Sequence, residues 1–473
     1  MTQETTRGLR PKDDPGDLPR SLAWALGSGT VLQGLNSAMI AVALVPIAIQ
    51  YGSSQSIPWL VSSLYIAAAV GAPAGGRLAD IFGARRLYLV GLVVVMIASI
   101  AGPFVPSVEW LIVDRVVLGL GTSIQFPAAM AIIRRQAHLT GRNAVGAIGV
   151  VAVCGQATAA LGPTVGGLVT AAIGWPGIFW VNLPLVMNSA VWLLLVVPAD
   201  EKKPRRSFRA TITVLDLPGT TLFIAALVVL MITLLSAGDA PMWWAVGLVV
   251  GLVALLVLRE RRAASPFIDL RVLAAHPQIA LTCLRAVITF TSFYCVFYGL
   301  PQWLESTRHL DPAATGLLML PVFGVGVLST FLAARIGRRL KPRLLLLFGT
   351  SAMVLAGAAL VLFVDSGSSL LVIAGIAALL GVPNGFNNLG NQLLLHGGSP
   401  STSAGSATGL YRTSQYLGAC VSTVVVAHTL DVNSPEGGIA RLGMWIAMLG
   451  AFLLVGNLVA MWIEPRRQRK EPS

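Results

Sequence analysis

Long apolar runs alternate with short polar segments along almost the whole chain. Runs of about 20 residues match the length at which an α-helix crosses the hydrocarbon core of a bilayer. Boundaries drawn at charge, Pro and Gly predict fourteen spans, at residues 22–50, 57–76, 87–106, 109–133, 143–172, 175–198, 214–236, 242–258, 277–301, 312–334, 344–364, 369–394, 404–430 and 438–463. We therefore predict an all-α integral membrane protein with fourteen transmembrane helices.

The placement of basic residues predicts how these spans are oriented. Of 33 Lys and Arg residues, 28 fall in the two terminal segments and in alternate loops, whereas only Arg308 and Arg441 lie on the opposite side. This asymmetry is the positive-inside rule, and with an even number of spans it puts both termini in the cytoplasm. The expected location is the cell membrane, plasma or inner. The net charge of +13 is then explained by topology, and a nucleic-acid partner is not expected.

Composition points the same way. Hydrophobic residues make up 55% of the chain and charged residues 11%, whereas a soluble domain carries roughly a quarter charged residues. A soluble fold is therefore not expected.

Two strongly basic segments, 201–209 and 259–262, divide the spans into groups of six, two and six. The predicted parts are a cytoplasmic N-terminal tail (1–21), an N-terminal six-helix bundle (22–198), basic linkers with an inserted helix pair at 214–236 and 242–258 (199–276), a C-terminal six-helix bundle (277–463) and a basic cytoplasmic tail (464–473). The loops "GGRLADIFGARRL" (75–87) and "AARIGRRLKPRL" (333–344) echo each other and suggest two related halves. Secondary transporters are often built from such repeats.

Three short motifs carry a family resemblance. "GRLADIFGARR" (76–86) resembles the cytoplasmic loop motif of the major facilitator superfamily, "RVVLGLG" (115–121) its fourth-span motif, and "TAALGPTVGG" (158–167) the fifth-span motif associated with antiporters. Fourteen spans resemble the drug:proton antiporter branch, which has a two-helix insert. The resemblance implies the major-facilitator fold of two six-helix pseudo-repeats with an inserted pair. It also implies proton-coupled export of small amphipathic compounds such as drugs, antibiotics or secondary metabolites, and hence antibiotic resistance.

Two of these motifs suggest moving parts. The first supplies a conformational latch, since a carboxylate at a helix end can pair with Arg or with a helix N-terminus of the other half. Its residues are Gly76, Asp80, Gly83, Arg85 and Arg86. The fifth-span residues Gly162, Pro163, Gly166 and Gly167 remove side-chain bulk and one backbone donor. They form either a packing site or a gating pivot, and the sequence does not choose between the two.

The first span departs from the family pattern in "LNSAMIAVAL" (35–44), where Asn36 stands at the place of an acid. An amide cannot release a proton, so Asp114 becomes the only carboxylate expected well inside a span. Asp114 and Arg115 are adjacent and point about 100° apart on a helix, with Arg115 expected to reach toward Asn36. Asp114, Arg115 and Asn36 are the candidates for proton coupling. An ion pair that only fixes packing is the alternative for Asp114.

Polar side chains within other spans give the candidates for a substrate cavity. A membrane Arg costs about 2.5–3.5 kcal/mol on insertion scales, so such residues usually face the bundle interior or water. Four Asn residues repeat on one helix face in "NGFNNLGNQ" (384–392), as interhelical hydrogen-bonding groups or as a polar path. For Tyr294 and Tyr298, core packing is the favoured interpretation. The candidates are Gln33, Gln125, Arg285, Tyr294, Tyr298, Asn384, Asn388, Asn391, Arg412, Gln415 and Tyr416.

The sequence shows no motif for metal binding, nucleotide binding or catalysis. No two of the five His residues have metal-ligand spacing, and the chain has no phosphate-binding loop or catalytic motif. We expect no metal, cofactor or nucleotide and no enzyme activity. The expected partners are a small-molecule substrate, protons and the lipid bilayer, with the chain as a monomer. A transporter of an anionic or polar metabolite is one alternative function, and a non-transporting sensor or enzyme is another.

Overall fold

The computed structural model describes residues 17–52, 56–200, 216–236, 243–263, 266–267, 270–337, 339–398, 404–430 and 437–468. Within these ranges the chain is helical, and its β-type pairing is a single bridge between Asp17 and Asn143. The prediction of an all-α fold is confirmed. The residues before Asp17 and after Gln468, which belong to the predicted tails, lie outside the described residues. The segment 201–215 of the predicted linker also lies outside them.

The N-terminal bundle comprises α1 (Arg20–Met39), η1 (Ile40–Val42), α2 (Leu44–Tyr51), α3 (Ile57–Phe82), α4 (Ala84–Ala101), η2 (Gly102–Phe104), α5 (Val108–Thr140), α6 (Val145–Ile173), α7 (Gly177–Trp180) and α8 (Asn182–Val196). The chain bends by 60° between the segment Arg20–Val42, which comprises α1 and η1, and the helix α2. One predicted span, at 22–50, is therefore a bent pair.

The inserted pair is α10 (Leu217–Leu235) and α11 (Trp243–Arg262), followed by the short α12 (Leu270–Ala275). The C-terminal bundle comprises α13 (Pro277–Ser306), α14 (Pro312–Leu318), α15 (Leu320–Ile336), α16 (Pro342–Phe363), α17 (Leu370–Gly398), α18 (Ala404–Thr429) and α19 (Gly438–Gln468). The division of the spans into groups of six, two and six stays a prediction.

Eleven described helices are long and apolar enough to cross a membrane, or twelve if the bent pair is one span. Two further helices, α6 and α18, are 29 and 26 residues long. At about 1.5 Å per residue, each is long enough to cross a hydrocarbon core of about 30 Å. The chain is a multi-pass membrane protein, and the count of fourteen spans stays a prediction.

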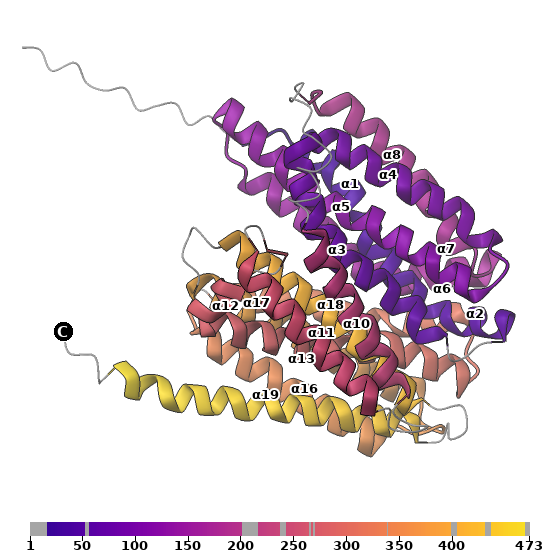
Figure 1. The fold of residues 1–473 in the computed structure, drawn as a ribbon. Coiled ribbons are helices and arrows are strands. Elements are labelled where there is room, and N and C mark those ends of the chain that lie inside the picture. The colour runs from indigo at the N-terminus through magenta and orange to yellow at the C-terminus, as the bar shows by residue number, and fades with distance from the viewer. Residues whose placement is uncertain are drawn as a thin grey trace, which may run out of the picture.

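The two bundles pack side by side, the N-terminal bundle drawn in indigo and violet and the C-terminal bundle in orange and yellow (Figure 1). They meet where α3 packs on α18 and where α6 packs on α14. The inserted helix α10 contacts both α3 and α18, so it lies along the seam between the bundles. We call the side on which α1 begins and α19 ends the terminal side, and the opposite side the far side.

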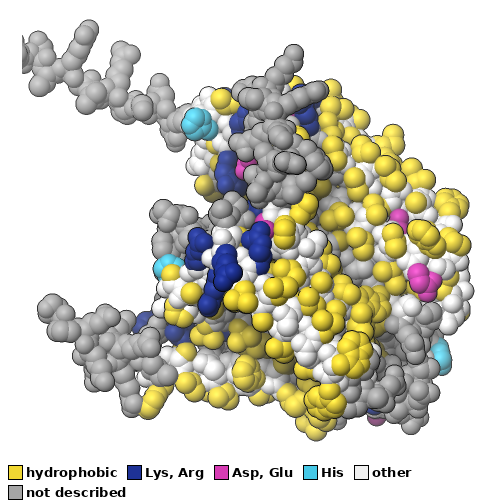
Figure 2. Space-filling view, in the orientation of Figure 1, with side chains coloured by type: hydrophobic (Ala, Val, Ile, Leu, Met, Phe, Trp, Pro, Cys, Tyr) yellow, Lys and Arg dark blue, Asp and Glu magenta, His cyan; other side chains and the backbone are white. Residues whose placement is uncertain are grey.

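The outer surface is largely apolar, as expected for helices that face lipid. Figure 2 shows hydrophobic side chains over most of the visible face, with Lys and Arg gathered toward the terminal side. Trp243 and Trp244, at the far-side start of α11, are 76% and 68% exposed. Trp is enriched at the level of the lipid headgroups, so these side chains mark one edge of the apolar band.

The tight turn between α3 and α4 depends on one glycine. Gly83 has φ of +99°, a backbone conformation that side chains disfavour, and a Cβ here would meet the carboxyl group of Asp200. Asp200 accepts hydrogen bonds from the backbone N–H groups of Arg85 (3.3 Å) and Arg86 (2.9 Å), and pairs with Arg135 at 3.4 Å. This carboxylate therefore joins the end of α8 to the start of α4 and to α5.

We expect Gly83→Ala to destabilise the protein, because a side chain at this positive φ adds backbone strain of about 1–3 kcal/mol and displaces Asp200. The melting temperature of the purified protein in detergent measures the effect. Gly149→Ala is the matched control, since a Cβ there meets open space. Equal melting temperatures for the two variants would contradict this account of the turn.

Candidate functional site

Hydrogen bonds cross between the bundles at mid-helix and on the far side. Gln33 of α1 donates to the hydroxyl of Tyr416 on α18 at 2.8 Å. Ser62 of α3 and Thr423 of α18 share a hydrogen bond of 2.8 Å. Farther along, the hydroxyl of Thr164 donates to the carbonyl oxygen of Gly316 at 2.8 Å. The described halves are thus joined from the middle of the spans to the far side.

Four of the seven tyrosines gather at this interface. Tyr65 lies with its ring centroid 5.2 Å from Tyr294, 6.5 Å from Tyr298 and 5.9 Å from Tyr416. The hydroxyls of Tyr65 and Tyr298 are 2.8 Å apart, and the Tyr298 hydroxyl lies 2.8 Å from the carbonyl oxygen of Ser37. We call these four residues the tyrosine cluster. Sequence reasoning missed Tyr65, because Ser62 is its single polar neighbour at helical spacing and two residues do not make a recognisable stripe.

One positive charge lies beside this cluster on the terminal side. The guanidinium of Arg412 on α18 stacks over the ring of Phe126 on α5, 4.0 Å from its centroid. A cation over an aromatic face gains about 0.5–2 kcal/mol, more when water is excluded. Arg412 is therefore held at the boundary between the halves, and its place in a substrate path stays a prediction.

Arg115 anchors three helices of the N-terminal bundle. It is 1% exposed, and its Nε donates to the carbonyl oxygen of Leu60 at 3.1 Å. Both terminal nitrogens donate to the carbonyl oxygen of Asn36 at 3.3 Å. Arg115 thus reaches the first span as expected. Its charge is satisfied by backbone dipoles of α1 and α3.

The side chain of Asn36 points away from the tyrosine cluster, toward α8. Its amide exchanges two hydrogen bonds with Asn182, at 2.8 and 2.9 Å, and Asn182 also donates to Ser99 at 2.9 Å. All three side chains are buried. Asn182 escaped sequence reasoning because a single amide in an apolar run has no periodic signal.

Asp114 faces a different set of neighbours from Arg115. It is 7% exposed, and a Cβ on Gly102 would meet its Oδ2 together with the ring of Phe179. Oδ2 has no hydrogen-bond partner, and no ion pair joins Asp114 to Arg115 in the part of the chain that the structure describes. The carboxylate lies inside the N-terminal bundle rather than at the tyrosine cluster.

A second buried carboxylate lies beyond the predicted ninth span. Helix α13 continues to Ser306 instead of residue 301, and Glu305 in its last turn is 7% exposed. Its Oε1 has no hydrogen-bond partner among the described groups. Sequence reasoning placed Glu305 in a loop because the apolar pattern stops before the helix does.

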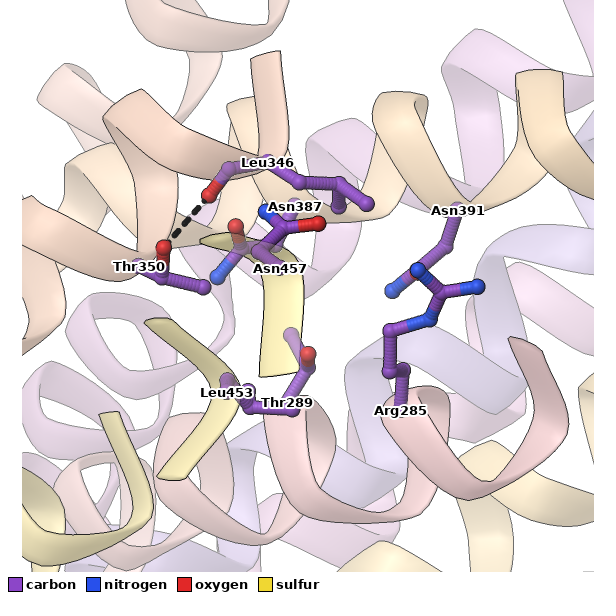
Figure 3. Close-up of a pocket in the computed structure, with 8 residues that line it drawn as sticks. All are labelled: Arg285, Thr289, Leu346, Thr350, Asn387, Asn391, Leu453 and Asn457. Carbon is purple, nitrogen blue, oxygen red and sulfur yellow. Dashed lines mark hydrogen bonds between the residues drawn. The ribbon is translucent and has the colours of Figure 1, made fainter. Parts of the chain in front are cut away.

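A polar pocket inside the C-terminal bundle collects several other candidates. Helices α13, α16, α17 and α19 enclose it, and Figure 3 shows its lining. The lining residues are Arg285, Thr289, Leu346, Thr350, Asn387, Asn391, Leu453 and Asn457. Arg285 and Asn391 were predicted from the sequence, whereas Asn457 was missed as another lone amide. Asn384 lines a neighbouring pocket with Ser292 and Thr289.

The remaining candidates are dispersed. Gln125 is fully buried in the N-terminal bundle, where its amide donates to the carbonyl oxygens of Tyr88 and Gly121, both at 3.5 Å. The structure therefore does not bring Gln125 to the interface. Asn388 accepts from the hydroxyl of Tyr411 at 3.0 Å. Gln415 is partly buried on α18, one residue before Tyr416.

The fifth-span glycines serve close helix contacts of two kinds. A Cβ on Gly162 or Gly166 would meet Ala38 or Met39 of α1, within the N-terminal bundle. A Cβ on Gly167 would meet the carbonyl oxygen of Pro312 on α14, in the other half. The motif therefore packs α6 within its own bundle and also against the opposite bundle.

The residues of the predicted latch lie on the terminal side of the N-terminal bundle. Arg85 donates to the carbonyl oxygen of Leu194 at 3.1 Å in addition to its contact with Asp200. Arg77, near the end of α3, donates to the carbonyl oxygen of Pro266 at 2.7 Å. Pro266 belongs to the linker before the C-terminal bundle. The hydrogen bonds that Arg85 and Arg86 donate to Asp200 and Leu194 thus stay within their own half.

Two helical bundles that meet at a polar, aromatic interface at mid-span are an arrangement typical of secondary transporters. The model of the Major Facilitator Superfamily matches residues 26–423, and the chain belongs to this family. It is 34% identical over 408 residues to the MFS-type transporter YwoD of Bacillus subtilis (strain 168), covering 85% of this chain and 88% of that one.

Two further proteins extend this comparison. The tetracenomycin C resistance and export protein of Streptomyces glaucescens is 27% identical over 416 residues, covering 85% of this chain and 74% of that one. Among solved structures, a bacterial homologue of the human drug peptide transporters PepT1 and PepT2 matches with a TM-score of 0.64. It is 14% identical and covers 96% of this chain and 99% of that one, a likeness of fold alone.

We expect Asn182→Leu to lower the melting temperature, because it leaves the Oδ1 of Asn36 buried without a donor, at a cost of about 1–3 kcal/mol. The double variant Asn36→Leu/Asn182→Leu should recover part of that loss, since both polar groups are then removed. The melting temperatures of the wild type, both single variants and the double variant together make a double-mutant cycle. Strictly additive losses would contradict a direct Asn36–Asn182 interaction.

Proposed function

We propose that the protein exports small amphipathic organic compounds by proton-coupled alternating access. The observation that carries the substrate class is the tyrosine cluster, which brings aromatic faces and hydroxyl groups from both bundles to mid-span. Pockets for drug-sized compounds are predominantly apolar and aromatic, with a few polar groups that fix orientation. The exporter named among the relatives supports the same substrate class.

The distribution of hydrogen bonds between the two halves supports alternating access. The hydrogen bonds that join them run from mid-span to the far side, while Arg85 and Arg86 bind within their own half. A rocker-switch would break the far-side contacts, including the approach of Gly167 to α14, and form others on the terminal side. Asp80 and the Arg pair then serve as the latch of the second state. In this scheme the protein acts as a monomer in the cell membrane, with both termini in the cytoplasm.

We assign proton binding to Asp114. Its buried Oδ2 has no hydrogen-bond partner, so the acid form loses no interaction that the structure provides. The adjacent Arg115 ties α5 to α1 and α3 through backbone carbonyls. A change of charge at Asp114 acts on that guanidinium at close range, because the interior screens charges weakly. Proton binding is thereby linked to the packing of three helices.

A second candidate function is transport of an anionic metabolite. Arg412 favours it, because this cation lies at the boundary between the halves and stacks on Phe126 rather than on a carboxylate. An anionic compound at the tyrosine cluster would find its counter-charge there. The two candidates differ in the charge of the compounds that bind.

The substrate class is tested with purified protein in proteoliposomes, using fluorescent aromatic compounds that are cationic, neutral or anionic. We expect neutral or cationic compounds to be transported, and Tyr65→Ala and Tyr416→Ala each to raise the KM about 3–10-fold, the equivalent of a lost aromatic contact of about 0.5–1.5 kcal/mol. Phe363→Ala, at a 64% exposed position, is the control. Transport of anionic compounds only, abolished by Arg412→Gln, would support the second candidate instead.

Proton coupling is tested with a pH-sensitive dye enclosed in the same vesicles. We expect Asp114→Asn to abolish substrate-dependent proton movement while exchange of labelled for unlabelled substrate continues. Glu109→Gln, an exposed carboxylate on the same helix, is the matched control, and Glu305→Gln examines the second buried acid. Undiminished proton movement in Asp114→Asn would remove Asp114 from the mechanism.

A further inference from the structure

The polar pocket of the C-terminal bundle is enclosed by that bundle alone. Arg285 and Thr289 come from α13, Thr350 from α16, and Asn457 from α19. Asn387 and Asn457 lie together at one end of the pocket, and Arg285 and Asn391 lie at the other (Figure 3). No lining residue comes from the N-terminal bundle, so the pocket is separate from the tyrosine cluster.

The amide groups that line the pocket are buried and have no hydrogen-bond partner. Asn387 and Asn391 are 0% exposed and Asn457 is 2% exposed. Neither the nitrogen nor the oxygen of these three side chains makes a hydrogen bond with the described protein. Buried polar groups in folded proteins nearly always have a partner, whether protein, water or ion. Three such groups around one cavity point to a bound species.

The charge of the lining indicates which kind of species fits. Arg285 has a buried Nε without a hydrogen-bond partner, and its terminal nitrogen donates to Thr282 at 3.3 Å. The guanidinium of Arg343, at the start of α16, lies close enough to repel it electrostatically. The lining contains no carboxylate. The pocket therefore offers amide and guanidinium donors and carries net positive charge.

The volume of the pocket narrows the choice further, since about 10 Å³ leaves room for a single small particle. A water molecule would satisfy amide groups but would leave the positive charge uncompensated, and an organic anion is too large. We propose that the pocket binds one small inorganic anion, of chloride size, with Arg285 as its counter-charge. The amides of Asn387, Asn391 and Asn457 donate hydrogen bonds to it.

Such an anion would stabilise the C-terminal bundle, because it contacts α13, α17 and α19 at once. It does not depend on which compound the protein transports. The same geometry explains why Arg285 is tolerated inside a membrane bundle: the arginine and the anion enter the protein interior as a neutral pair.

The test compares thermal unfolding of the purified full-length protein in sodium chloride and sodium gluconate at equal ionic strength. We expect the melting temperature to rise by about 2–4 °C in chloride and to saturate with its concentration, as for a ligand that binds the folded state alone. Bromide should replace chloride. The shift should vanish in Arg285→Gln and in Asn457→Leu, and it should persist in Arg308→Gln, an arginine of the far-side loop.

Two outcomes would contradict the proposal. Equal melting temperatures of the wild type in the two salts would mean that the pocket holds water only. A chloride effect that persists in Asn457→Leu, or that rises without saturation, would be a general salt effect. If Arg285→Gln does not fold, Asn457→Leu alone decides, because it removes one amide without altering charge. A chloride shift in a variant that no longer transports would separate this site from the proposed function.

Discussion

Every polar group inside a hydrocarbon layer must find its partner within the protein, and this constraint governs both bundles. In the N-terminal bundle the guanidinium of Arg115 lies on the carbonyl oxygens of Asn36 and Leu60, and the amide of Asn36 pairs with Asn182. In the C-terminal bundle the amides of Asn387 and Asn457 meet no hydrogen-bond partner among the described residues. Two halves of one architecture thus treat buried amides in opposite ways. One half uses them as internal connections, and the other leaves them facing a pocket.

The same constraint shapes the interface between the halves. Hydroxyl groups do most of the joining, since Tyr65, Tyr298 and Tyr416 all make their hydrogen bonds there. A phenol supplies one polar contact on a large apolar ring, so it suits a surface that must separate without exposing charge. Arg412 is the exception, and it stacks on Phe126. Among the described residues, hydrogen bonds and aromatic contacts therefore hold the interface together, and ion pairs do not.

Much of the fold could be predicted from the sequence, because apolar length and the asymmetry of basic residues report directly on the bilayer. The helix ends could not, and α3, α5 and α13 all run several residues past the predicted spans. Helices continue into water, where the apolar pattern stops but the backbone hydrogen bonds do not. The bend between α1 and α2 was also missed, since its residues are apolar on both sides.

Some residues of the candidate site could be predicted from the sequence and others could not. Residues that form a stripe or a motif were found, such as Asn391, Arg412 and Arg115. Lone polar residues in apolar helices were not, and Asn182 and Asn457 became visible only when packing supplied their neighbours. Gln125 shows the opposite error, because it was predicted to line the cavity. Its side chain is instead turned toward the interior of its own bundle. Side-chain direction depends on the neighbouring helix, and one sequence does not specify that neighbour.

The carboxylate of Asp200 has a mechanical consequence. It holds the start of α4, the arginine of α5 and the end of α8 at a single point on the terminal side. Asp200 is therefore fixed to the rim of the N-terminal bundle by contacts with two other helices. Any rotation of that bundle carries Asp200 with it, because the residue moves together with α4 and α5.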